Sequence, residues 1–182
     1  MELELRKESF SCYNALPQQN EMCEQSAETI VPDYCPDIAR IVDASGCFFL
    51  RSREIVDERI SVSGMLKVTL LYIADGNAGL KSLEYTIPIE ESFEGHLKES
   101  CSDLCIDGQL NTLEVRAVNP RKVSTRAMIN FVYTAYCSHR LTTCEAVEQQ
   151  EDFGIETLCQ TQEVSLIKGI REKDFVFTEE IV

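Results

Sequence analysis

The side chains in this chain that are most able to act as nucleophiles or metal ligands are its nine cysteines and two histidines. Their only close groupings are Cys101 with Cys105 and the trio Cys137, His139 and Cys144. The trio forms a C-x-H-x4-C run that could supply three zinc ligands. On a strand, however, Cys137 and His139 would share a face while Cys144 pointed the other way. We therefore expect no metal or other cofactor, and we interpret the cysteines as ordinary buried or half-buried thiols. Cross-linking between chains in an oxidising environment is the alternative.

The sequence carries no signature of a catalytic site. It contains no glycine-rich phosphate loop, no G-x-S-x-G and no H-E-x-x-H. A Cys/His hydrolase would need a thiol beside His96 or His139, and no spacing marks such a pair. The carboxylates that could act as acid/base pairs are Asp33 with Asp37, and Glu90 with Glu91 and Glu94. On an acidic surface such groups are usually solvated, so we expect no enzyme.

Length and charge narrow the class of protein further. The chain has 182 residues, enough for one domain or one domain with an arm, and its formal charge is −14. This charge opposes binding to nucleic acid or anionic lipid. The longest apolar runs, such as Val68 to Ala74, are too short to span a bilayer. The residues after Met1 lack the pattern of a secretion signal, so we expect a cytoplasmic protein with no membrane insertion.

The stretch VPDYCPDIARIV, Val31 to Val42, predicts the only helix that we expect. Pro36 suits the first position of a helix, and Asp37 would then lie in its positive first turn. Ile38 and Ile41 follow at helical spacing, which predicts two or three turns buried on that face. Asp33 and Asp37 are better explained by capping and turn chemistry than by catalysis.

Elsewhere in the sequence, apolar residues recur mainly at every second position. From Arg59 to Tyr72 a series of apolar residues shares one parity, interrupted only by Gly64, which predicts a half-buried strand with a bulge at that glycine. The series is Ile60, Val62, Leu66, Val68, Leu70 and Tyr72. Turn residues at 74–79 and alternation from Leu83 to Ile89 complete an antiparallel hairpin. Pro88 suggests an edge position or a break in its second strand.

A second hairpin follows an acidic, turn-rich segment, Phe93 to Asp107. Its strands are Leu113–Ala117 and Val123–Ala135, and its tip is VNPRKV. We select four tip residues as a candidate partner-binding site: Asn119, Pro120, Arg121 and Lys122. The alternative is that the two cations belong to a solvated loop. Further strands are predicted at Glu2–Cys12, Phe48–Val56, Leu141–Val147, Val164–Ile167 and Phe175–Ile181.

These elements predict a mainly β fold, an antiparallel β-sandwich or open barrel of long hairpins with one short helix after the Pro-Asp motif. Residues 1–26 would form an N-terminal strand and a polar linker, Gln18 to Ala27. Residues 27–137 would form the β domain, and 138–176 would add strands that complete or flank it. The final residues, FVFTEEIV, echo SAETIV at 26–31, so residues 177–182 could begin a second related module.

The motifs together resemble the SPOCS domain of SipL-like proteins from endospore-forming clostridia. The segments that carry the resemblance are the Pro-Asp motif (Pro32, Asp33, Pro36, Asp37, Ile38, Ile41), VSGMLKVTLLY from Val62 to Tyr72 with Gly64 inside it, IPIEESFEG, and VRAVNPRKVSTRA. The resemblance covers roughly Ala27 to Tyr136. It implies a spore-envelope role in the mother cell, at the surface of the developing spore, and no catalytic residues.

The resemblance has one limit. We identify no LysM-like segment, which in SipL-like proteins docks the coat's morphogenetic ATPase, so that docking function is not carried over. We expect an interaction module that contacts other spore-envelope proteins or further copies of itself, without nucleic acid. A carbohydrate-binding β-sandwich is the alternative, but such modules usually use exposed aromatic platforms and this chain has no Trp.

Overall fold

The computed structural model describes residues 4–76, 79–95, 97, 101–148, 158, 160 and 162–173. These residues form strands and no helix. The strands are β1 (Glu4–Ala15), β2 (Gln19–Ile30), β3 (Ile38–Val56), β4 (Arg59–Ala74), β5 (Leu80–Glu94), β6 (Cys101–Asn119) and β7 (Lys122–Glu148).

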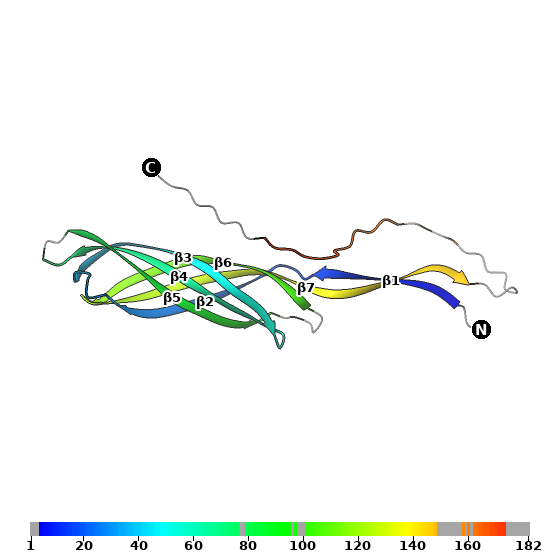
Figure 1. The fold of residues 1–182 in the computed structure, drawn as a ribbon, viewed down its shortest axis with the longest axis horizontal. Coiled ribbons are helices and arrows are strands. Elements are labelled where there is room, and N and C mark those ends of the chain that lie inside the picture. The colour runs from blue at the N-terminus through cyan, green and yellow to red at the C-terminus, as the bar shows by residue number, and fades with distance from the viewer. Residues whose placement is uncertain are drawn as a thin grey trace.

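The strands build two antiparallel sheets that pack as a sandwich (Figure 1). One sheet has the order β3-β4-β5, in which both expected features of the first hairpin appear: β4 pairs with β5 throughout, and β5 lies at an edge. The other sheet is centred on β7, which pairs with β6 along one side and with β2 and then β1 along the other. The mainly β prediction is confirmed, and the sheets do not close into a barrel.

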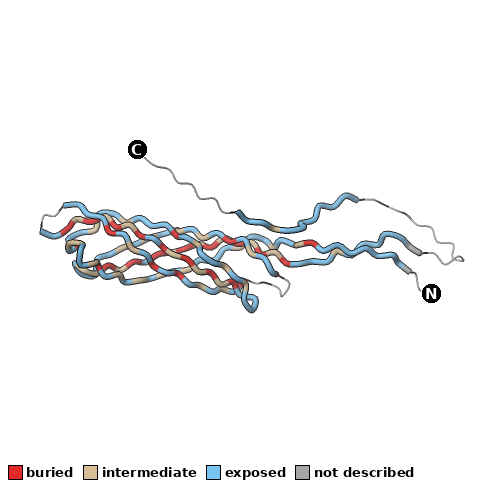
Figure 2. Tube along the Cα trace, viewed as in Figure 1, coloured by how far each residue is buried: buried red, intermediate tan, exposed pale blue. Residues whose placement is uncertain are grey.

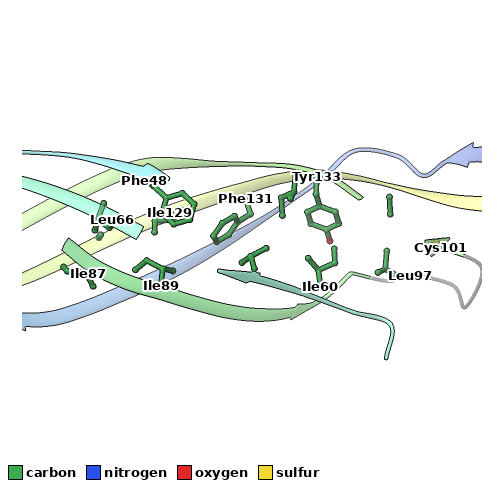
Figure 3. Close-up of a cluster of buried hydrophobic side chains, with 14 of the residues drawn as sticks. Phe48, Ile60, Leu66, Ile87, Ile89, Leu97, Cys101, Ile129, Phe131 and Tyr133 are labelled. Carbon is green, nitrogen blue, oxygen red and sulfur yellow. The ribbon is translucent and has the colours of Figure 1, made fainter. Parts of the chain in front are cut away.

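Strict alternation on β4 and β7 creates the core between the sheets. On β7 every second residue from Val123 to Cys137 is buried, and on β4 every second residue from Ile60 to Ala74 faces the same interior. The ring of Phe48 packs edge-on against Phe131 at a centroid distance of 5.6 Å (Figure 3). Tyr85 and Thr125, on different sheets, share a 2.7 Å hydrogen bond across this interior.

Beyond the sandwich, β1 and the second half of β7 continue as a two-stranded arm, defined here as Glu4–Ala15 paired with Tyr136–Glu148. Figure 2 shows that exposed residues predominate in this arm, whereas buried residues concentrate in the sandwich. Residues 162–173 lie beside it: the Tyr13 N–H donates to the Ile167 carbonyl at 2.9 Å, and Glu172 pairs with Arg53 on β3. This segment links the arm to the sandwich.

The predicted helix after Pro36 is wrong, because β3 begins at Ile38. The pairing of β3 with β4 skips Ala39 and Val42, so each of these residues forms a β-bulge. A bulge adds one residue to the strand, which turns the usual two-residue spacing into a spacing of three. Ile38 and Ile41 therefore share an inward face as they would on a helix, and the sequence pattern could not distinguish the two.

Other expectations also need correction. The polar linker is the strand β2, whose backbone pairs along the whole first half of β7 although its side chains are mostly polar. The segment before Asp107 is strand from Cys101 onward. Gly64 continues β4 without a bulge, and the extra residue is Arg51 on the neighbouring β3. A Cβ on Gly64 would lie 2.4 Å from the Phe48 ring, so this glycine makes room for that ring.

The strands predicted at 2–12, 48–56 and 141–147 match β1, β3 and the end of β7. Pro88 does not break β5. Val164–Ile167 forms only the single bridge to Tyr13. The strand expected at Phe175–Ile181 and the echo at 177–182 lie outside the described residues.

Candidate functional site: a clasp around Arg121

The Pro-Asp motif and the tip of the second hairpin, predicted separately, meet at one end of the sandwich. We call this structure the clasp, formed by residues 31–38 and 119–121. The Arg121 guanidinium lies at its centre and donates four hydrogen bonds. The acceptors are the carbonyls of Val31 (2.9 Å) and Cys35 (2.7 Å) and the Oδ1 atoms of Asp33 (3.0 Å) and Asp37 (3.2 Å).

Backbone hydrogen bonds fix the same two segments. The Val31 N–H donates to the Arg121 carbonyl at 2.8 Å, and the Ile38 N–H donates to the Pro120 carbonyl at 2.9 Å. Within the loop, the Cys35 N–H donates to the Pro32 carbonyl at 2.9 Å, which closes a turn. The backbone on either side of Pro36 is therefore held by a turn and by the second hairpin rather than by helical bonds.

The clasp covers a small apolar cluster between the sheets, made of Val31, Ile38, Leu70, Tyr72, Ala74, Leu83 and Val123. The buried Tyr72 hydroxyl donates to the Pro36 carbonyl at 3.2 Å. Burial raises the pKa of the Tyr72 phenol, and the nearby Cys35 thiol adds to the shift. Tyr72 therefore remains a neutral hydrogen-bond donor at ordinary pH.

The predicted site residues thus have different roles. Arg121 is bonded within the chain, and Asn119 accepts the Arg121 N–H at 2.8 Å through its side-chain oxygen. Lys122 forms an ion pair with Glu28 on β2. Beside them, Ile30 and Tyr34 are 73% and 85% exposed. The sequence analysis did not predict that the two motifs meet; the opposite charges of Arg121 and the two aspartates were the only signal. A partner contact by Asn119–Lys122 stays a prediction.

The remaining carboxylate candidates, Glu90, Glu91 and Glu94, lie on β5. Glu91 accepts a hydrogen bond from Gln25, and Glu94 pairs with Arg59. Glu90 and Glu91 border a shallow pocket of about 370 Å³. Its other lining residues are Ser52, Glu54, Ser61, Val62, Ser63 and Ser92. Hydroxyls and carboxylates could bond to a sugar, but no aromatic residue lines this pocket, so no stacking platform for a glycan is present there.

The cysteines differ from the expected set of free thiols, because Cys101 and Cys137 form a disulfide. They are 36 residues apart in the chain and become neighbours only through the pairing of β6 with β7. Cys137 is therefore no zinc ligand, and no group of side chains that could hold a metal occurs among the residues that the structure describes. Burial raises the pKa of the Cys23 thiol to about 11, with the Glu91 charge adding to the effect, which makes this thiol a poor nucleophile.

One cysteine does lie opposite a histidine, since Cys12 on β1 faces His139 on β7. The Cys12 thiol is buried and donates to the His139 carbonyl at 3.6 Å. His96 lies outside the described residues. The described residues also contain no helix that could cross a membrane.

The sandwich and its clasp define an all-β antiparallel module whose polar groups hold loops in place. Residues 37–118 match the family model described as SipL, SPOCS domain. This match covers less than half of the chain; it makes that part similar to a SPOCS domain, and the similarity points to a sporulation-related module. The match spans β3 to β6, so β2 and β7, which complete the sandwich, lie outside it, as do Pro32, Asp33, Pro36 and Asn119–Lys122. No curated protein and no solved structure matches the chain.

Proposed function

We propose that the chain is a non-enzymatic structural and interaction module of a spore-envelope protein, which acts through protein–protein contacts during endospore assembly. The SPOCS match supports the link to sporulation. The clasp supports a structural role, because the charged groups of Arg121, Asp33 and Asp37 bond to one another. On this proposal the protein works in the mother cell at the surface of the developing spore, with other spore-envelope proteins or its own copies as partners.

The observation that supports a partner contact at the clasp is the exposure of two large side chains, Ile30 and Tyr34. Ile30 faces Lys122 across the β2–β7 pairing, and Tyr34 lies in the loop that Arg121 holds. Two large apolar side chains on a well-anchored surface favour a protein contact, and tyrosine is enriched in such interfaces. The candidate residues Asn119–Lys122 would then form the polar border of this contact.

The test is a pull-down from sporulating cells with the tagged chain as bait. The variant Ile30→Glu/Tyr34→Glu leaves every Arg121 bond in place and should lose the captured spore-envelope proteins. The matched control is Phe49→Glu/Leu80→Glu, since both of these side chains are also more than half exposed but lie on the other sheet. The control should capture the same proteins as the unchanged chain.

Two results would count against the proposal. Equal capture by all three baits would remove the contact at the clasp but keep the interaction role. If the unchanged chain captured no spore-envelope protein, and a fluorescent fusion stayed away from the developing spore, the proposed function itself would be wrong. Circular dichroism of each variant shows that the fold is retained before the captures are compared.

A further inference from the structure

Three cysteines gather where the sandwich passes into the arm. Cys101 opens β6 and is bonded to Cys137 on β7. In the β1–β7 pairing, Cys137 faces Asn14 and Cys12 faces His139. Opposed residues of an antiparallel pair share a face, and so do residues two apart on one strand. Cys12, Cys101 and Cys137 therefore lie on the same face of the sheet, and all three are buried.

Their order across the sheet matters chemically. β6 and β1 both pair with Tyr136 and Cys137, so they must occupy opposite edges of β7 at this point. Cys12 thus approaches Cys137 from the side opposite to Cys101. Thiol–disulfide exchange requires a thiolate to attack one sulfur and expel the other, and attack from behind the leaving sulfur is the geometry that this order provides. Figure 3 shows Cys101 at the end of the buried cluster, past Leu97.

A small movement is needed before the attack. Cys12 and Cys137 are diagonal neighbours, and such Cα atoms are about 7–8 Å apart, slightly beyond the range of about 4.4–6.8 Å that a disulfide requires. β1 is the element that can supply this movement. Among the described residues, its backbone bonds to β7 and, through Tyr13, to Ile167, and two-stranded ribbons open at low cost.

We propose that Cys12 exchanges with the Cys101–Cys137 disulfide, which moves the bond to Cys12–Cys137 and releases Cys101. The Cys12 thiol leaves its bond to the His139 carbonyl and gives its proton to solvent. The thiolate then forms a bond to the Cys137 sulfur, the Cys101–Cys137 bond breaks with its electron pair on the Cys101 sulfur, and that thiolate takes up a proton. No oxidant is consumed. The disulfide then links β1 to β7 instead of linking β6 to β7.

The experiment uses the full chain with its disulfide formed. The chain is held at a series of pH values, its free thiols are alkylated, and linked peptides are identified by mass spectrometry. Chains with Cys12 bonded to Cys137 and Cys101 alkylated should appear faster at higher pH, because the thiolate is the attacking species. Cys12→Ser should abolish Cys101 alkylation. Cys105→Ser is the matched control on β6, since Cys105 is a free, exposed thiol, and should leave the exchange unchanged.

A second variant removes the competing bond. In a glutathione buffer that keeps Cys101–Cys137 oxidised in the unchanged chain, Cys101→Ser should form Cys12–Cys137 instead. If Cys12 and Cys137 both stay alkylatable in that folded variant, the two sulfurs do not meet and the proposal is wrong. If Cys101→Ser fails to fold, the comparison of the unchanged chain with Cys12→Ser decides: equal alkylation of Cys101 in both overturns the exchange.

Discussion

Arg121 and Asp33 are 88 residues apart in the chain, yet the Arg121 Nη2 atom donates to Asp33 Oδ1 at 3.0 Å. This hydrogen bond joins the Pro-Asp motif to the tip of the second hairpin. The Asp33 side chain is fully exposed, so the ion pair by itself stabilises the fold little. The two bonds from the same guanidinium to the carbonyls of Val31 and Cys35 are part-buried and contribute more.

The first prediction concerns the stability that Arg121 provides. Arg121→Ala should lower the free energy of unfolding by about 2–3 kcal/mol, since two part-buried carbonyls lose charge-assisted hydrogen bonds. Arg121→Lys should restore little, because a lysine cannot reach four acceptors in the fork geometry of a guanidinium. Urea denaturation followed by circular dichroism measures both changes.

Lys122→Ala is the matched control, because Lys122 has the same charge on the next residue and its side chain forms an ion pair with Glu28. It should cost less than about 1 kcal/mol. Equal unfolding midpoints for Arg121→Ala and Lys122→Ala would show that the clasp depends on its backbone bonds alone.

The second prediction separates two positions of the Pro-Asp motif. Ile38 is buried at 3% exposure, whereas Ile41 is only partly buried. Ile38→Asp should unfold the protein, because a buried unpaired carboxylate costs more than about 4 kcal/mol. Ile41→Asp should stay folded with a lower melting temperature, since its side chain can turn towards water. A helix with both residues in its buried face would make the two variants alike, and thermal unfolding by circular dichroism distinguishes the cases.

Alternation identified the long strands from the sequence because their two faces meet different surroundings. Every second residue from Val123 to Ala135 contacts the core, so the period of two is unbroken. The bulges at Ala39 and Val42 give the start of β3 a helical spacing. The strand β2 has few apolar residues because its stability comes from backbone pairing with β7, which composition does not report.

The candidate site was predictable only in its parts. The turn at Asn119-Pro120 and the two Pro-Asp pairs follow from local residue types. Their contact depends on β2 pairing with β7 so that Val31 arrives beside Arg121. The disulfide is equally non-local, because Cys101 and Cys137 meet only through the register of β6 and β7.

The third prediction tests the slot that holds the Phe48 ring. A Cβ on Gly108 would lie 2.5 Å from the ring atom Cε1 of Phe48, so Gly108→Ala should cost about 1–3 kcal/mol through overpacking. Adding Phe48→Leu should recover part of that loss, which a double-mutant cycle measures as coupling of more than about 0.5 kcal/mol. Gly169→Ala is the control, because no atom lies within 4 Å of its Cβ position.

Gly64→Ala should respond differently to the same rescue. Its Cβ would also meet the backbone carbonyl of Phe49 at 2.6 Å, which a smaller side chain at position 48 does not relieve. If the losses of unfolding free energy caused by Gly108→Ala and Phe48→Leu simply add, the predicted contact between a Cβ at position 108 and the Phe48 ring is wrong.

The last prediction concerns pH. Two hydrogen bonds from Arg126 to Glu24, at 2.6 and 2.8 Å, hold the pKa of the Glu24 carboxyl below its usual 4.5. Because the folded-state pKa is the lower one, the stabilisation is complete above pH 4.5 and is lost as the pH falls through the folded-state value. Glu24→Gln should therefore melt below the unchanged chain near neutral pH, and the gap should close in acid. In the control Glu145→Gln, the lost ion pair with Arg6 is a single 3.2 Å contact between exposed side chains of the arm, so we expect no comparable gap. A gap for Glu24→Gln that stayed constant from neutral pH to pH 3 would mean that the carboxylate charge is not its source.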